Sequence, residues 1–230
     1  MSVRRLATHQ PEGFAFTPAN LEWANAQIKK YPDGRQASAV LPILWRAQEQ
    51  VGGWLPEPAL RYVADMLGLA YIRIYEIATF YTMFNLAPVG RHYVQVCGTT
   101  PCWLRGADEI KDTCRRLIGA PGQVTEDGLF SWTEVECLGA CVNAPVVQID
   151  KDYYEDLVPK SLERILKELK AGRPVVPGPQ DGRQASAPLG GPITLTDPEL
   201  YREEAGAPAD PPKPGALKQA PRTSRRPKPR

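Results

Sequence analysis

The sequence has few residues of the kinds that identify a site directly. Its 230 residues include two histidines and five cysteines. A Rieske centre, which needs two histidines beside its cysteines, is therefore excluded. The net charge of +2 gives no global indication of a nucleic-acid partner or a membrane surface. The best apolar run, residues 37–45, contains a proline and is far shorter than the roughly 20 residues of a membrane-spanning helix.

Recognisable nucleotide motifs are also missing. The chain has neither G-x-G-x-x-G nor G-x-x-x-x-G-K-[ST], the two glycine-rich patterns that hold phosphates. Any NADH or flavin chemistry is therefore expected on another chain. Residues 1–14 include arginines but no apolar signal core, so we expect no export. In a reducing compartment, cysteines more often bind metal or do redox work than form structural disulfides.

Four of the five cysteines form two tight pairs. Four residues separate Cys97 from Cys102, and three separate Cys137 from Cys141. Small residues surround both pairs, so backbone N–H groups can approach the sulfurs closely. Four cysteines without histidine suit a [2Fe–2S] or [4Fe–4S] cluster, or a structural zinc ion. Zinc knuckles usually have two residues between cysteines, and the C-x-x-C motif of dithiol redox sites is absent. Spacing alone favours an iron–sulfur cluster and leaves zinc open.

The first half of the chain is predicted to be helical, because apolar residues recur at the spacing of one helix face. Three segments show this pattern: 18–31, 38–52 and 56–69. Ser38 is expected to cap the second helix, and Gly52 to end it. Residues 71–84 are apolar on nearly every side, which favours a helix buried against other helices or against a partner.

From residue 92 the pattern becomes that of a small α/β domain. Alternating apolar residues predict strands at 92–97, 128–137 and 145–150, and helical spacing predicts helices at 104–118 and 161–172. Each cysteine pair lies where a strand gives way to a loop, so we expect the four sulfurs at one end of this domain. Cys114 shares a helix face with Ile110, Leu117 and Ile118, and we interpret it as a core residue.

Composition changes near Pro177. Residues 177–230 contain 12 of the 24 prolines, and seven Lys or Arg but no acidic residue follow Asp210. This composition predicts a largely disordered tail whose removal, as residues 178–230, leaves the stability of the folded part nearly unchanged. Two interpretations of the tail stay open: a solvated extension, and a segment that lies with its apolar residues 193–201 along an acidic groove of a neighbour.

The heptapeptide DGRQASA occurs twice, at residues 33–39 and 181–187. It recurs only once, without the regular period of a repeat architecture. We interpret the recurrence as coincidence.

The cysteine motifs carry a resemblance to a known family. "CGTTPCWLRG" and "VECLGACVNAPVVQIDKDYYEDL", with "IYEIATFYTMF" upstream, resemble the thioredoxin-like [2Fe–2S] ferredoxin subunits of respiratory complex I, NADH:quinone oxidoreductase. The resemblance covers residues 14 to about 175 and implies an α+β protein, with a helical domain before a thioredoxin-like α/β domain. Carried over by position, it makes Cys97, Cys102, Cys137 and Cys141 the ligands of one [2Fe–2S] cluster. The expected domains are an extension (1–17), a helical domain (18–88), the ferredoxin domain (89–176) and the Pro-rich, basic tail (177–230).

The resemblance also implies a function. It predicts an electron-transfer subunit whose cluster exchanges single electrons with FMN, while a partner F subunit binds FMN and NADH and a large iron–sulfur G subunit lies nearby. It places the chain peripherally, in the hydrophilic arm of complex I, on the cytoplasmic side of the bacterial inner membrane or the matrix side of a mitochondrial one. Two alternatives stay open. One is the equivalent subunit of an NAD-linked hydrogenase or formate dehydrogenase, and the other is a zinc-stabilised interaction module.

Overall fold

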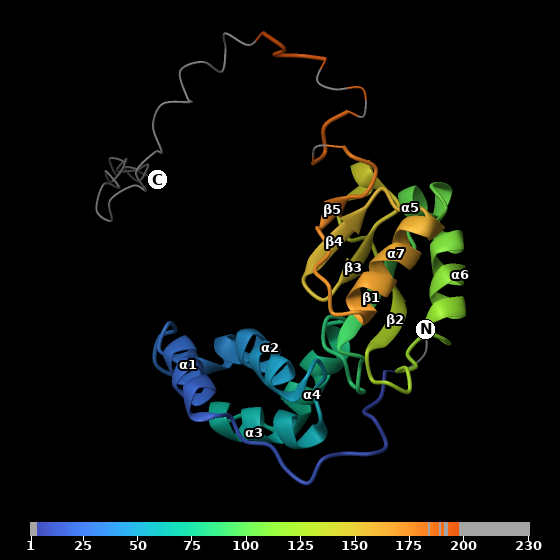
Figure 1. Ribbon diagram of the computed structural model, residues 1–230. Helices are drawn as coiled ribbons and strands as arrows, with labels where there is room; N and C mark the ends of the chain where they lie inside the picture. The colour runs from blue at the N-terminus through green and yellow to red at the C-terminus, as the bar shows by residue number, and fades with distance from the viewer. Residues whose placement is uncertain (1–3, 184, 189, 191–192, 198–230) are drawn as a thin grey trace, which may run out of the picture. The chain divides into compact units, whose positions relative to one another are not determined.

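The computed structural model describes residues 4–183, 185–188, 190 and 193–197. Contacts along the backbone divide the chain into two units, Met1–Ser186 and Ala187–Arg230. Every described helix and strand belongs to the first unit (Figure 1). The described residues of the second unit form turns, bends and irregular chain. The predicted groove-binding segment 193–201 lies partly outside the described residues, and the basic end lies wholly outside them.

Helices make up the N-terminal part of the first unit. They are α1 (Pro18–Ile28), α2 (Val40–Val51), α3 (Glu57–Leu67) and α4 (Tyr71–Phe80), with a 3₁₀ turn η1 (Gln36–Ala39) before α2. The hydroxyl oxygen of Thr17 accepts a hydrogen bond from the N–H of Asn20 at 3.3 Å and so caps α1. Both α2 and α3 end at a glycine with positive φ, Gly52 and Gly68, as the sequence pattern indicates for Gly52.

Two expectations about these helices need correction. The Ser38 cap is wrong: Ser38 lies inside η1, and α2 follows Ala39 without a side-chain cap. Residues 71–84 do form a helix over Tyr71–Phe80, but only Ile74 and Ala78 in it are buried. Phe80 is 77% exposed, because this helix packs on α3 with one side and turns the other to solvent in the isolated chain.

A five-stranded sheet forms the second part of this unit. Its strands are β1 (His92–Cys97), β2 (Phe130–Val135), β3 (Val147–Ile149), β4 (Asp152–Glu155) and β5 (Gly178–Pro179), in the order β2-β1-β3-β4-β5. The outer pairs β1/β2 and β4/β5 are parallel, and the pairs β1/β3 and β3/β4 are antiparallel. The predicted strand 92–97 matches β1, whereas β2 and β3 are shorter than predicted.

Helices α6 (Ala107–Leu117) and α7 (Pro159–Lys170) pack beside each other on this sheet (Figure 1). The alternating residues Val94 and Val96 of β1 share a buried cluster with Ile110 of α6 and Ile165 of α7. Because residues i and i+2 of a strand point to the same face, both helices cover one face of the sheet. A short helix α5 (Thr100–Leu104) and a 3₁₀ turn η2 (Cys141–Asn143) lie in the cysteine loops and were not predicted.

Two strands were not predicted, and the second lies in the Pro-rich tail. β4 contains Tyr153 and Tyr154 between charged residues, so it shows no clear apolar alternation. β5, residues Gly178–Pro179, pairs with β4 although it has almost no side-chain pattern. The prediction of a disordered tail from residue 177 is therefore wrong for its first residues. Its greater part, 198–230, lies outside the described residues.

The hydrophobic cores of the helical part and the sheet part are distinct. The buried cluster of the helices consists of residues between Phe16 and Leu86, and the two clusters of the sheet part consist of residues from Val94 onwards. This separation agrees with two folding units joined near residue 89. The domain boundaries themselves stay a prediction.

Close packing at Gly90 gives a test of the fold. A Cβ on Gly90 would lie 2.3 Å from the backbone carbon of Phe130, and backbone of a paired strand cannot move aside. We expect Gly90→Ala to lower the free energy of unfolding by about 3 kcal/mol, measured by chemical denaturation. Gly13→Ala is the matched control, because a Cβ there meets nothing within 4 Å. Equal stability of the two variants would contradict the described approach of residue 90 to β2.

Candidate metal centre

The first cysteine pair is positioned by the end of β1. Cys97 is the last residue of β1, and its N–H donates to the carbonyl of Val146 at 3.2 Å. The next N–H, of Gly98, donates to the carbonyl of Val135 at 3.1 Å. Helix α5 then brings Cys102 back to the same place. Both thiols are buried, with 2% and 1% of each residue exposed.

The second pair reaches this place through strand register. β1 and β2 run parallel, and Cys97 lies opposite Val135, two residues before Cys137. The Sγ atoms of Cys137 and Cys141 are 3.5 Å apart. Between them, Gly139 has a φ of +82°, a conformation that glycine adopts readily, and its N–H donates to the sulfur of Cys137 at 3.4 Å. Unlike the first pair, these two cysteines are exposed.

The second cysteine loop is fastened to the sheet. The hydroxyl of Tyr153, in β4, donates to the carbonyl of Leu138 at 2.9 Å. Beyond the loop, the N–H of Asp156 donates to the carbonyl of Asn143 at 2.7 Å, and the side chain of Asn143 donates to Glu155 Oε2 at 2.5 Å. Sequence patterns did not indicate Tyr153 or Asn143, because a residue that holds a ligand loop carries no motif of its own.

The thiols interact with one another electrostatically. Burial raises the pKa of Cys97, but hydrogen bonds from Thr99 and from backbone N–H groups outweigh it, so the pKa lies below the ordinary value. Burial, with Cys97 beside it, raises the pKa of Cys102 to about 12. The Gly139 N–H lowers the pKa of Cys137, and Cys137 in turn raises the pKa of Cys141. Thiolates this close repel one another, so binding of a cation favours them together.

This donor set fits a binuclear iron–sulfur cluster. Two thiolates that share one tetrahedral metal at about 2.3 Å lie roughly 3.8 Å apart, close to the separation of Cys137 and Cys141. Among the described residues, no three His, Cys, Asp or Glu side chains surround a single metal position. The sulfurs are gathered as pairs, which suits two irons with two thiolates each better than one zinc ion with four.

The fifth cysteine lies apart from these four. Cys114 is fully buried in α6, in the hydrophobic cluster that includes Ile110 and Ile118. Burial raises the pKa of its thiol to about 12. A neutral thiol among aliphatic side chains behaves as a small apolar residue. This placement agrees with the interpretation of Cys114 as a core residue.

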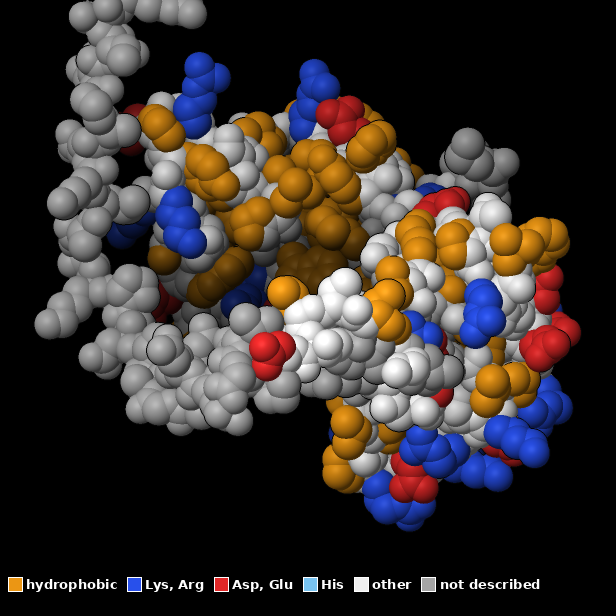
Figure 2. Space-filling model, turned by 90° about the horizontal axis from the view of Figure 1, so that it is seen from above, with side chains coloured by type: hydrophobic (Ala, Val, Ile, Leu, Met, Phe, Trp, Pro, Cys, Tyr) orange, Lys and Arg blue, Asp and Glu red, His pale blue; other side chains and the backbone are white. Residues whose placement is uncertain are grey.

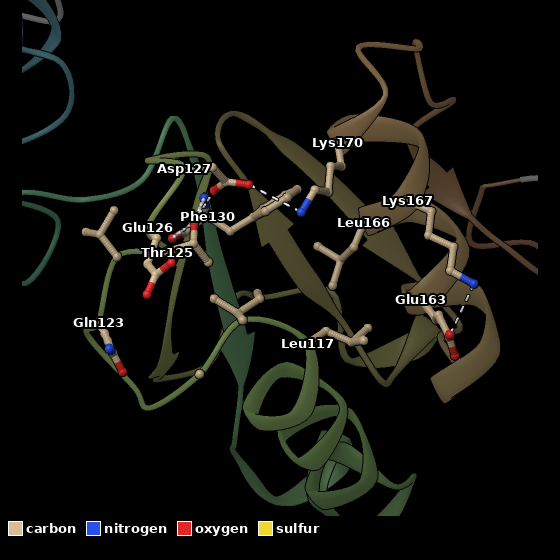
Figure 3. A pocket seen from close by; sticks show the side chains of 13 residues that line it. Leu117, Gln123, Thr125, Glu126, Asp127, Phe130, Glu163, Leu166, Lys167 and Lys170 are labelled. Carbon is tan, nitrogen blue, oxygen red and sulfur yellow. Dashed lines mark hydrogen bonds and ion pairs between the residues drawn. The ribbon is translucent and has the colours of Figure 1, made fainter.

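A pocket of about 600 Å³ lies away from the cysteines, between α6, α7 and the start of β2. Figure 3 shows Leu117, Phe130 and Leu166 along it, with charged side chains at its edges. Both of its lysines are ion-paired at 3.3 Å, Lys170 with Asp127 and Lys167 with Glu163. Because these ammonium groups are already neutralised, the pocket is poorly suited to hold a phosphate group.

Known proteins resemble the chain along most of its length. A family model described as thioredoxin-like [2Fe-2S] ferredoxin matches residues 24–170. The first E subunit of NADH-quinone oxidoreductase of Rhizobium meliloti (strain 1021) is 57% identical over 210 residues, which are 89% of this chain and 76% of that protein. The E subunit of NADH-quinone oxidoreductase of Rickettsia bellii (strain RML369-C) is 58% identical over 158 residues, which are 68% of this chain and 95% of that protein.

Two solved structures are also similar in part. The wild-type thioredoxin-like [2Fe-2S] ferredoxin from Aquifex aeolicus has 27% identity and a TM-score of 0.31, over 36% of this chain and 90% of that one. An NAD⁺-reducing [NiFe]-hydrogenase in the air-oxidised state has 22% identity and a TM-score of 0.48, over 57% of this chain and 23% of that one. The family match and the relatives at more than half identity decide the assignment: this chain belongs to the thioredoxin-like [2Fe-2S] ferredoxin family.

Proposed function

We propose that this chain is the electron-transfer subunit of an NADH:quinone oxidoreductase, and that Cys97, Cys102, Cys137 and Cys141 hold its [2Fe–2S] cluster. The observation that carries the proposal is the meeting of two cysteine loops, which the parallel register of β1 and β2 brings to one end of the sheet. The relatives named as the E subunit of NADH-quinone oxidoreductase support the same function. The chain is one subunit of a larger NADH-oxidising assembly.

When bound, the cluster accepts and releases one electron at a time. The protein residues around it control its environment. The hydroxyl of Thr99 lies 3.3 Å from the sulfur of Cys97, and the N–H of Gly139 donates to Cys137. Hydrogen bonds to cluster sulfurs stabilise the extra negative charge of the reduced state and so raise the reduction potential. Burial of Cys97 and Cys102 keeps water from one side of the site.

The exposed side of the site is where we place electron exchange with a partner. Cys137 and Cys141 are exposed, and Trp103, Leu104 and Val142, each within two residues of a cysteine, are each more than half exposed. Hydrophobic side chains are exposed over much of the face drawn in Figure 2. Exposed apolar side chains around a redox site favour docking of another protein. The proposed partner there is the F subunit, which carries FMN and NADH, with the large iron–sulfur G subunit nearby.

The proposed location is peripheral, in the hydrophilic arm of complex I, on the cytoplasmic or matrix side of the membrane. In the described part of the chain, no helix has the length and apolar character to cross a membrane. The equivalent subunit of an NAD-linked hydrogenase or formate dehydrogenase uses the same kind of cluster. The partner that co-purifies with the tagged chain distinguishes these assemblies.

Substitution of single cysteines tests the ligand set. We expect Ala at position 97, 102, 137 or 141 to leave the chain with less than half of its iron and acid-labile sulfide, because a missing thiolate removes both charge and a metal bond. Cys114→Ala is the control, and it should keep two irons per chain because Cys114 lies in the core of α6. Full iron in all four variants, or stoichiometric zinc in colourless wild-type protein, would contradict the proposal.

A second test separates this chain from its flavin partner. The isolated chain should contain no flavin and should not reduce ferricyanide with NADH, because its sequence lacks recognisable phosphate-binding motifs. Addition of the F subunit should then allow NADH to reduce the cluster, followed by its visible absorbance. Oxidation of NADH by the isolated chain, in preparations free of flavoprotein, would show that the division of labour is wrong.

A further inference from the structure

The chain returns to the cysteine site after α7. β5 runs parallel to β4, and the N–H of Gln180 donates to the carbonyl of Glu155 at 3.0 Å. This pairing leads the next residues, the second DGRQASA heptapeptide, past the end of β4 and towards the loop that carries Cys141. The strand contains almost no side-chain information, but it determines where Arg183 lies.

Arg183 is largely buried against that loop. The exposed fraction of its side chain is 13%, and that of Asp156, its ion-pair partner, is 5%. Arg183 Nη2 lies 3.2 Å from Asp156 Oδ1. Its Nη1 lies 3.5 Å from the carbonyl oxygen of Val142 and 3.4 Å from Oδ1 of Asn143. One guanidinium therefore contacts the two residues that directly follow Cys141.

Asn143 connects these contacts into one network. It is 2% exposed, its carbonyl accepts from the Asp156 N–H, and its amide donates to Glu155 and, at 3.0 Å, to the carbonyl of Ala185. The loop after Cys141 is thus held by β4 on one side and by residues 183–185 on the other. Buried networks of this kind fix a conformation because each member has few other partners.

The ion pair also has atoms left to pair. Asp156 Oδ2 and Arg183 Nε are buried and have no hydrogen-bond partner among the described residues. Nε and Nη2 together form the side of the guanidinium that binds a carboxylate with two parallel hydrogen bonds. A small rotation of either side chain towards this bidentate geometry satisfies both atoms, whereas removal of either partner leaves a buried charge alone.

The two copies of the heptapeptide behave differently. Arg35, in the first copy, is exposed and precedes the 3₁₀ turn η1 of the helical part. Arg183, at the same place in the second copy, is held against the Cys141 loop. Identical local sequence therefore gives different environments, and Arg35 offers a control matched in sequence on both sides.

We propose that Arg183 is a positioning residue for the iron–sulfur site: it clamps the Cys141 loop through Val142, Asn143 and Asp156, and its charge favours the reduced cluster. The proposal rests on the proposed ligand role of Cys141. Loss of the clamp frees the loop and speeds cluster release. Loss of the positive charge leaves Asp156 unbalanced, which disfavours an added electron and lowers the reduction potential.

The test compares Arg183→Gln with Arg35→Gln in the full chain within its purified assembly. Removal of a residue that orients a metal ligand typically costs about 10- to 100-fold in metal affinity. We expect Arg183→Gln to release iron to a chelator faster by about the same factor and to shift the EPR-monitored reduction potential to a lower value. Arg35→Gln should match the wild type in both. Equal behaviour of Arg183→Gln and Arg35→Gln would overturn the proposal.

Two further variants separate the clamp from the charge. Arg183→Lys keeps the charge but loses the planar fork, so its reduction potential should stay near that of the wild type while iron release stays faster. In Arg183→Gln/Asp156→Asn the buried charges are gone together, so the potential should return towards the wild-type value without slower iron release. If Arg183→Lys releases iron at the wild-type rate, or the double variant keeps the lowered potential, the two-part role is wrong.

The result for Cys141→Ala distinguishes failure of this inference from failure of the proposed function. Loss of the cluster in Cys141→Ala, with wild-type behaviour of Arg183→Gln, contradicts only the role of Arg183. A full cluster in Cys141→Ala contradicts the ligand set, and with it the reason for a clamp at this loop. Circular dichroism of each variant confirms that the fold is retained, so that a change in potential is not a consequence of unfolding.

Discussion

The parallel pairing of β1 with β2 is the constraint on which the site depends. It places Cys97, at the end of one strand, opposite Val135, just before the loop of the other cysteine pair. The pairing is held by the apolar residues that β1 and β2 bury beneath α6 and α7. A shift of one residue in this register would turn these residues to the other face. The core of the sheet and the geometry of the four sulfurs are therefore fixed together.

The site is asymmetric, and the asymmetry suits an electron carrier. Cys97 and Cys102 are buried in a small cluster with Ala107 and Val146, whereas Cys137 and Cys141 are exposed. The buried pair gives a rigid, dry floor, and the exposed pair gives a short path for electrons to a docked partner. The exposed loop needs support from elsewhere in the chain. Tyr153 supplies it at Leu138, and the network around Asn143 supplies it after Cys141.

Sequence patterns were sufficient where side chains repeat with a clear period or carry their own chemistry. The alternation of residues 92–97 predicted β1, and the cysteine spacing predicted a metal centre at the strand ends. The patterns were insufficient where tertiary contacts decide the structure. Ser38 has the right chemistry for a cap, but the chain enters α2 through a 3₁₀ turn. β5 is fixed by its pairing with β4, and the duplicated heptapeptide shows that its surroundings, not its letters, determine what Arg183 does.

The central claim is that this chain carries one [2Fe–2S] cluster on its two cysteine pairs. The most direct measurement is the EPR spectrum of the anaerobically purified chain after reduction with dithionite, integrated against protein concentration. The account predicts a signal from a single unpaired electron for each chain, present only after reduction, because a binuclear cluster takes up one electron. A reduced protein without an EPR signal that contains stoichiometric zinc would contradict it.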